Sequence, residues 1–134
     1  MSKKPESLFI QKVLKKLSPN YYAEKTHNQY RGGTPDLFVL GPSGLTLWLE
    51  FKWLPKLPAK HVLNLSELQL RWLKRAAGLD VPVGVVLGWK EGKDVRGAMF
   101  VVPSTWEQTH FREDLQAHSM DMAELALLIE SEAL

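Results

Sequence analysis

Residues Arg31 to Lys52 read RGGTPDLFVLGPSGLTLWLEFK, in which the turn sequence Gly-Pro-Ser-Gly separates two short apolar runs. Turn residues between two short runs of strand-forming residues are typical of a β-hairpin. A hairpin alone does not account for the polar residues, because Asp36 opens the first run and Glu50 and Lys52 close the second. The pattern therefore predicts two paired strands that bring charged side chains together at one end.

The predicted pairing sets the distance between the two acidic residues. Side chains alternate between the faces of a strand, so Glu50 and Lys52 share a face. Pairing the strands around the turn places Phe38 opposite Trp48 and Asp36 opposite Glu50, with Cβ atoms about 4.5–5.5 Å apart. Two carboxylates at that distance repel unless a divalent cation lies between them, and Mg²⁺ and Mn²⁺ prefer carboxylate and water oxygens. We therefore expect both acids to bind Mg²⁺ or Mn²⁺ directly.

These residues also form a motif. Pro35-Asp36 followed by Glu50-Phe51-Lys52 resembles the motif of the PD-(D/E)xK nucleases. The preceding Arg-Gly-Gly-Thr and the downstream Leu-Ser-Glu-Leu-Gln-Leu-Arg-Trp at 65–72 narrow the resemblance to the virus-type replication-repair nuclease (VRR-NUC) domains, over residues 3–102. Glu-x-Lys alone recurs by chance in many chains. Its combination with Pro-Asp, the preceding glycines and the segment at 65–72 is more specific. The resemblance implies an α/β fold with a PD-(D/E)xK restriction-endonuclease-like core, a mixed β-sheet flanked by helices, here followed by an extra C-terminal helix.

The resemblance also suggests further site residues. In this family a glutamate on the first helix completes the metal site, often through water, and Glu6 matches that position, with Glu24 as the alternative. A glutamate in a first helical turn is explained equally well by the helix dipole. The Phe51 backbone carbonyl is a further candidate ligand. The family places a glutamine near the site, which here is Gln69, although a capping box with Ser66 would explain that glutamine completely.

Two helices and two further strands are expected around the hairpin. Pro5 suits a first helical position and Ser18-Pro19 ends a helix, so residues 5–17 are expected to be helical. A second helix is predicted over residues 66–77, ended by Gly78. Prolines within residues 53–64 predict an irregular basic loop. The core side of the second helix is expected to consist of Leu68, Trp72, Leu73 and Ala76. Strands are expected over 81–87 and 98–102, separated by a polar turn over 88–97.

The charge is distributed unevenly along one domain, residues 1–134. Residues 1–100 hold 16 Lys and Arg against 8 Asp and Glu, whereas residues 101–134 hold 1 against 7, within a net charge of +2. The core over residues 3–102 is therefore a candidate polyanion binder, and the acidic helical tail over residues 103–134 is not. The plain alternative is a solvated surface. Its last helix, over residues 120–134, would pack on the domain or on a second subunit.

Eight basic residues are candidates for contacts with DNA phosphates. His27 could shuttle a proton or contact phosphate, although an isolated histidine more often does neither. The lysines of the first helix lie away from its apolar stripe and could equally face solvent. The eight candidates are Lys12, Lys16, Lys25, Arg31, Lys56, Lys60, Lys74 and Arg75.

Composition limits the classes of function. The chain has no cysteine, which excludes disulfides and thiolate zinc sites. It shows no apolar run of membrane-spanning length and no signal-peptide pattern, so a soluble cytoplasmic protein of a bacterium or a phage-infected cell is expected, with no membrane partner.

The expected function is that of a Mg²⁺- or Mn²⁺-dependent endodeoxyribonuclease. Stand-alone members of the family imply hydrolysis of branched DNA, such as four-way (Holliday) junctions, by a homodimer. In this interpretation Lys52 orients the attacking water or neutralises the phosphate, and Gln69 positions a water or the backbone. One ion or two remains open. The alternatives are a flap nuclease, a sequence-specific restriction-like nuclease, or a module that keeps the nuclease fold and binds DNA without cutting it.

Overall fold

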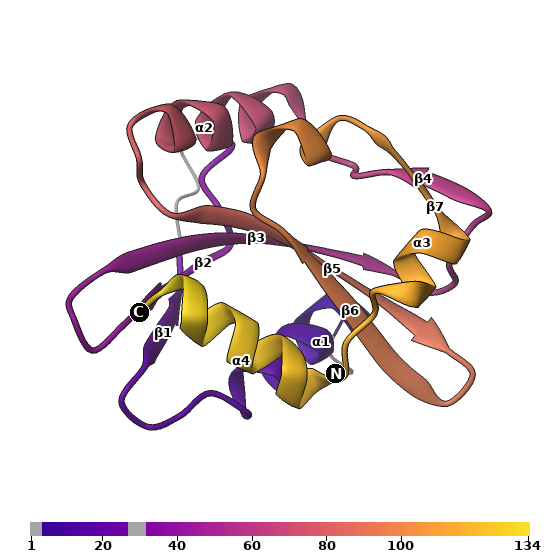
Figure 1. Ribbon diagram of the computed structural model, residues 1–134, viewed down its shortest axis with the longest axis horizontal. Coiled ribbons are helices and arrows are strands. Elements are labelled where there is room, and N and C mark those ends of the chain that lie inside the picture. The colour runs from indigo at the N-terminus through magenta and orange to yellow at the C-terminus, as the bar shows by residue number, and fades with distance from the viewer. Residues whose placement is uncertain (1–3, 27–31) are drawn as a thin grey trace.

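A computed structural model describes residues 4–26 and 32–134. Helices and strands follow one another as a mixed α/β chain, in agreement with the predicted class (Figure 1). The elements are α1 (Pro5–Leu14), β1 (Tyr22–Lys25), β2 (Leu37–Leu40), β3 (Thr46–Leu54), β4 (Lys60–Val62), α2 (Glu67–Gly78), β5 (Val83–Glu91), β6 (Asp94–Phe100), the 3₁₀ helix η1 (Pro103–Trp106), β7 (Thr109–Phe111), α3 (Arg112–Ala117) and α4 (Met122–Glu132).

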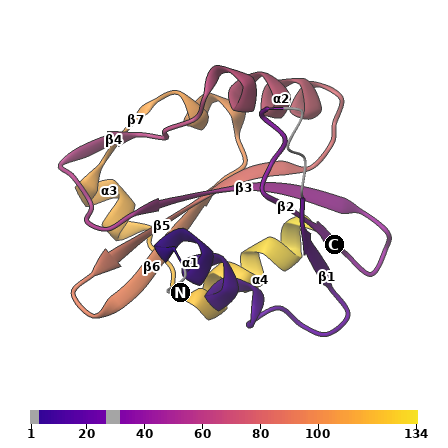
Figure 2. The same cartoon turned by 180° about the vertical axis from the view of Figure 1, so that it is seen from behind.

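A five-stranded sheet of order β1-β2-β3-β5-β6 forms the centre of the molecule. β3 and β5 pair in parallel, with α2 in the crossover between them, and the other neighbours pair antiparallel. β4 and β7 form a separate two-stranded sheet. Figures 1 and 2 show α1 and α4 on one side of the central sheet, and α2, α3 and the small sheet on the other.

The alternation along β3 divides the core into two clusters. Leu47, Leu49 and Phe51 are fully buried on the side of α1 and α4. Trp48 and Leu54 pack on the opposite side, with the residues of α2. β3 therefore faces apolar layers on both sides, and a polar side chain in its middle is withdrawn from water.

The predicted hairpin register is confirmed by the pairs Phe38↔Trp48 and Leu40↔Thr46. The ladder ends at Leu37↔Leu49, however, so Asp36 and Glu50 are not a strand pair. β3 continues to Leu54 paired with β5, while β2 does not follow it on the other side. This leaves one edge of β3 without a strand partner beyond residue 49 among the described residues, and Asp36 lies there.

Several element predictions need correction. The first helix ends at Leu14, and residues 15–17 form a turn. The loop expected over residues 53–64 contains strand β4, which pairs with a segment about 50 residues later, a contact that prolines nearby cannot indicate. Residues 88–97 are mostly strand, because β5 and β6 pair up to a tight turn at Gly92, whose φ is 64°.

α2 and α4 complete the comparison with the predicted elements. Leu68, expected in the core, is 49% exposed, because it lies in the first turn of α2 beyond the edge of the sheet. α4 packs on its own domain: Leu125 and Ile129 are fully buried in the cluster that contains Phe9. Within residues 4–26 and 32–134, no helix has both the length and the apolar character required to cross a membrane.

Candidate active site

Asp36 is held at the open edge of β3 by its main chain and its side chain. Its carboxylate accepts a hydrogen bond from the Phe51 amide, with 2.8 Å between Oδ2 and N. Its carbonyl accepts a hydrogen bond of 2.9 Å from the Thr26 amide. The carboxylate therefore takes the place of the missing strand partner. Because the N–H and C=O of one strand residue point to the same edge, the Phe51 carbonyl faces this edge as well.

Glu50, Lys52 and Gln69 form a connected polar group beneath α2. Gln69 Nε2 donates to Glu50 Oε2 across 3.0 Å, and Lys52 Nζ donates to Gln69 Oε1 across 3.0 Å. The Lys52 ammonium also lies 3.6 Å from Glu50 Oε2. Side chains two apart on β3 thus face the same helix, as their alternation requires. The Gln69 side-chain amide therefore holds the Glu50 carboxylate on one side and the Lys52 ammonium on the other.

The predicted capping box of α2 is present and involves the same glutamine. Ser66 Oγ accepts a hydrogen bond from the Gln69 amide, and Gln69 Oε1 accepts one from the Ser66 amide at 2.9 Å. Gln69 Oε1 thereby has two donors, the Ser66 amide and the Lys52 ammonium. The helix cap is therefore confirmed, and the same side chain also contacts Glu50 and Lys52, so capping does not prevent the predicted role at the site.

Aromatic contacts that the sequence reasoning missed fasten α2 over this part of the sheet. The Trp48 ring lies between those of Phe38 and Trp72, with centroid distances of 5.4 Å and 5.5 Å. Trp48 projects from the same face of β3 as Glu50, which the strand alternation could have indicated. This packing fixes the height of Gln69 above Glu50.

Glu6 approaches the same group from α1. Burial raises the pKa of Glu6, and the negative charge of Asp36 raises it further, while the Lys52 ammonium lowers it. These interactions place the Glu6 carboxylate in the electrostatic environment of the site. Glu24, the alternative candidate, is exposed on β1 and accepts a hydrogen bond from the Tyr22 hydroxyl.

Glu50 is the most perturbed acid of the site. Its side chain is 4% exposed, and its Oε1 atom has no hydrogen-bond partner among the described residues. Burial, and after it the negative charge of Asp36, raise the pKa of Glu50 to about 8. A buried carboxylate with an unpaired oxygen beside other carboxylates is costly unless a proton or a cation compensates it.

The donor set fits a divalent cation in part. Within the described residues, no three His, Asp or Glu side chains converge closely enough to surround one ion. Mg²⁺ does not require such a cage, because it is usually bound through one or two carboxylates and keeps several waters. The unpaired Oε1 of Glu50, the Asp36 carboxylate and the Phe51 carbonyl could supply oxygens of this kind. The set excludes soft metals, since it offers no sulfur.

The two glycines before Asp36 allow the chain to pack closely against α2. A side-chain carbon at Gly33, whose φ is 94°, would collide with the Leu68 carbonyl oxygen. One at Gly32 would meet the Leu68 side chain at 2.7 Å. These glycines therefore permit a close approach to the first turn of α2.

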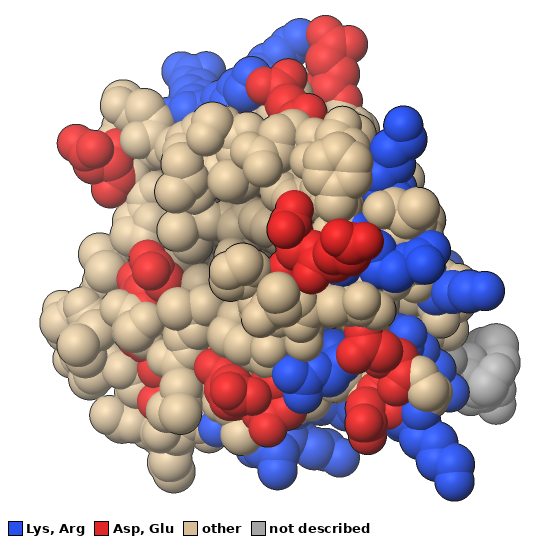
Figure 3. Space-filling view, turned by 45° about the vertical axis from the view of Figure 1, so that its right-hand side comes forward, with Lys and Arg blue, Asp and Glu red and all other residues tan. Residues whose placement is uncertain are grey.

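The predicted DNA-contact residues are spread over several elements. Lys12, Lys16, Lys25, Lys56, Lys60, Lys74 and Arg75 are all exposed, whereas Arg31 and His27 lie outside the described residues. Lys74 forms an ion pair with Glu107, so its charge is partly neutralised. On the face in Figure 3, basic side chains lie mainly around the rim with acidic ones beside them.

Comparison with known proteins supports the fold. Neither protein-family models nor curated protein sequences match this chain. The 1.6 Å structure of Hjc, a Holliday junction resolvase from the archaeal hyperthermophile Archaeoglobus fulgidus, is similar, with a TM-score of 0.56 and 18% identity. The match covers 92% of this chain and 97% of that chain. The predicted mixed sheet flanked by helices, with a restriction-endonuclease-like core, is confirmed at the level of the fold.

Proposed function

We propose that this chain is a divalent-metal-dependent endonuclease of the VRR-NUC type that cuts branched DNA, such as four-way junctions, as a homodimer. The observation that supports it best is the buried Glu50, which shares its surroundings with Asp36, Lys52 and Gln69. A structural protein has no need of a carboxylate buried at such cost. The likeness in fold to Hjc, itself a Holliday junction resolvase, supports the substrate class.

Each residue has a distinct part in the proposed mechanism. Asp36, Glu50 and the Phe51 carbonyl would bind Mg²⁺ or Mn²⁺, which supplies positive charge to the phosphate during hydrolysis. The Lys52 side chain is 19% exposed, and Gln69 holds its ammonium group, which can neutralise a phosphate oxygen or orient the attacking water. Glu6 closes the site from α1. The Gln69 amide keeps Glu50 and Lys52 in fixed positions, which limits reorganisation during reaction.

A cleavage panel tests the activity. Four-way, flapped and linear duplex DNA are each incubated with the protein in Mg²⁺, Mn²⁺ or EDTA. We expect metal-dependent cleavage of the four-way DNA, abolished in Asp36→Asn and Glu50→Gln and retained in the surface control Asp94→Asn. Binding of DNA without cleavage in either metal would contradict the proposal that the protein is an enzyme. A sequence-dependent ladder on linear duplex would instead indicate a restriction-like nuclease. Light scattering of the protein checks the homodimer.

Metal binding has a readout that does not depend on activity. A ligand that binds only the folded state raises its melting temperature. Mn²⁺ should therefore raise the melting temperature of the wild-type protein and have a much smaller effect on Glu50→Gln. Glu6→Gln and Glu24→Gln separate the two candidate acids, because only the Glu6 variant should weaken the response to Mn²⁺.

A further inference from the structure

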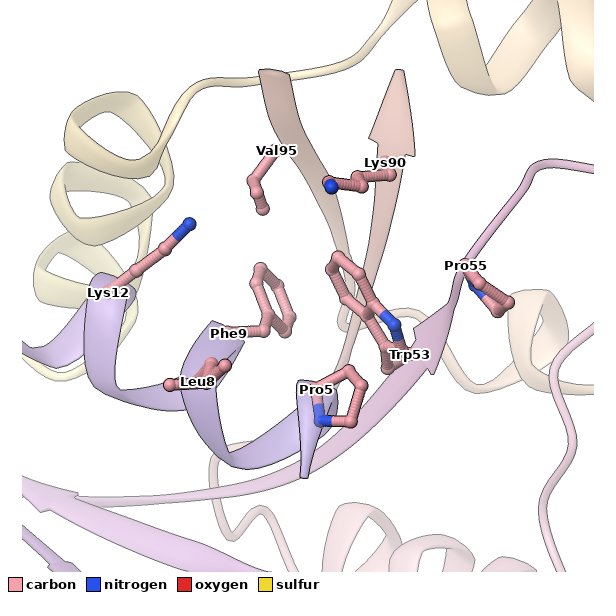
Figure 4. Close-up of a pocket in the computed structure, with 8 residues that line it drawn as sticks. All are labelled: Pro5, Leu8, Phe9, Lys12, Trp53, Pro55, Lys90 and Val95. Carbon is pink, nitrogen blue, oxygen red and sulfur yellow. The ribbon is translucent and has the colours of Figure 1, made fainter. Parts of the chain in front are cut away.

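A pocket of about 310 Å³ lies between α1, the end of β3 and the β5–β6 hairpin (Figure 4). Six of its lining residues are apolar, and the other two are lysines. It contains neither Asp36 nor Glu50, so it is distinct from the acidic site. Ligand pockets in proteins generally measure about 300–1,000 Å³, which makes this one suitable for a single small group such as one nucleobase.

The floor of the pocket is aromatic. The rings of Phe9 and Trp53 lie 5.6 Å apart at an angle of 40°. Phe9 is 1% exposed, whereas Trp53 is half-buried and presents part of its ring to the pocket. Phe9 can sit this deep because Gly88 lies beneath it, where any side-chain carbon would collide with its ring. The floor is therefore a supported surface on which a flat ring can stack.

The rim of the pocket is positively charged. Lys12 comes from α1 and Lys90 from β5, and Figure 4 shows their ammonium groups on two sides of the space above the rings. None of the described residues that line the pocket is acidic. A ligand that complements this arrangement has a flat, largely apolar body and a negative charge, which is the chemistry of a nucleotide.

The pocket and the acidic site are built on the same two segments. Pro5 lines the pocket and precedes Glu6, and Trp53 lines it and follows Lys52. The pocket therefore adjoins the acidic site along the chain, although Lys52 and Trp53 project from opposite faces of β3. Aromatic side chains that stack bases beside lysines that contact phosphates are the usual means of binding unpaired nucleic acid.

We propose that this pocket binds one unpaired nucleotide, with its base against Trp53, backed by Phe9, and its phosphate between Lys12 and Lys90. A strand of a branched DNA substrate is one source of such a nucleotide, and in that case the inference rests on the proposed function. A free nucleotide has the same chemistry and is the other source.

Binding of short single-stranded DNA tests the pocket without cleavage. Fluorescein-labelled hexathymidylate is titrated with the full chain in EDTA, and the affinity is read from fluorescence anisotropy. Trp53→Leu should weaken binding by at least about fivefold, because stacking on one aromatic ring is worth about 1–3 kcal/mol per base. Lys12→Ala with Lys90→Ala should also weaken it.

The matched control is Lys15→Ala with Lys93→Ala, which removes the same charge from the residue directly after α1 and from the turn of the β5–β6 hairpin, both outside the pocket. If both double lysine variants lost the same affinity, the effect would be due to overall positive charge and not to the pocket, which would overturn the proposal. Thymidine 5′-monophosphate as competitor distinguishes the sources. Much tighter binding of the hexamer than of the monophosphate identifies a DNA strand, whereas equal affinity identifies a free nucleotide.

A cross-link covers the case in which Trp53→Leu does not fold. Hexathymidylate with one 5-iodouracil is irradiated with the wild-type protein, and the modified peptide is identified by mass spectrometry. Attachment at Trp53 supports the pocket, and attachment only at other residues overturns it. A pocket variant that changes the oligomeric state but not the binding of hexathymidylate would contradict the proposal. It would indicate that the pocket contacts a second copy of the protein. None of these results depends on cleavage, so the pocket and the nuclease can fail separately.

Discussion

The side-chain amide of Gln69 lies against the carboxylate of Glu50, with 3.0 Å between Nε2 and Oε2. Its oxygen accepts hydrogen bonds from the Ser66 amide, at the start of α2, and from the Lys52 ammonium. One side chain therefore joins the capping of a helix to the geometry of the proposed active site.

Substitution of Gln69 is expected to reduce both stability and activity. Gln69→Ala removes the contacts to Glu50 and Lys52 and half of the capping box, so we expect about 1 kcal/mol less free energy of unfolding. Cleavage of four-way DNA should fall by at least about tenfold, because the acid and the base lose their common positioning group. Urea denaturation and initial cleavage rates measure the two effects.

Ser66→Ala is the matched control for this substitution. It removes the hydroxyl that accepts from the Gln69 amide but keeps the Ser66 backbone amide that donates to Gln69 Oε1. We expect a similar loss of stability and a much smaller loss of cleavage. Equal losses of activity in the two variants would mean that Gln69 acts only as a helix cap.

Stability without divalent metal should depend on pH through Glu50. The pKa of Glu50 is raised from 4.5 to about 8 in the folded protein, chiefly by burial, so the folded state binds this proton more tightly than the unfolded state does. The stability from this group is present below about pH 4.5 and is lost as the pH rises through about 8. In EDTA, the melting temperature of the wild type should fall over this range.

Glu50→Gln removes the titration and provides the comparison. Its melting temperature should fall less between pH 5 and pH 8, with Glu6 contributing a residual slope of the same sign, since its pKa is also raised. Mn²⁺ should reduce the wild-type slope, because a cation favours the ionised carboxylate. A wild-type melting temperature that rises over this range would contradict the electrostatic description of the site.

A side chain at Gly33 should destabilise the fold more than one at Gly44. Both glycines have positive φ, 94° and 89°, so alanine is strained at each, by about 1–2 kcal/mol. A carbon at Gly33 would also collide with the Leu68 backbone, whereas one at Gly44 would meet open space. Urea denaturation of Gly33→Ala and Gly44→Ala should therefore show the larger loss for Gly33, and equal losses would refute the packing of this loop on α2.

The ion pair between Lys74 and Glu107 should limit the part of Lys74 in DNA binding. Arg75→Ala should weaken binding and flatten its dependence on salt, because fewer counterions are released. Lys74→Ala should have a smaller effect on both. Glu107→Gln frees the lysine and should strengthen binding, measured by anisotropy with four-way DNA between 50 and 200 mM salt in EDTA. A loss of affinity in Glu107→Gln would show that the ion pair is required.

The sequence alone determined the parts of the site that depend on short-range geometry. A turn of defined length and the alternation of side chains are sufficient to predict the register of β2 and β3, the shared face of Glu50 and Lys52, and the proximity of Asp36. The capping box of α2 was likewise predictable, because Ser66 and Gln69 are three residues apart.

Only the tertiary structure decided the rest. Asp36 binds the Phe51 amide instead of facing Glu50 in a ladder, because β2 begins only at Leu37, one residue after Asp36. Glu6, Gln69 and the partners of β4 reach their positions from elements that are distant in sequence, through packing on the two faces of the sheet. Such contacts depend on how whole layers stack, and no local periodicity records them. The raised pKa of Glu50 belongs to this category, since burial is a property of the assembled core.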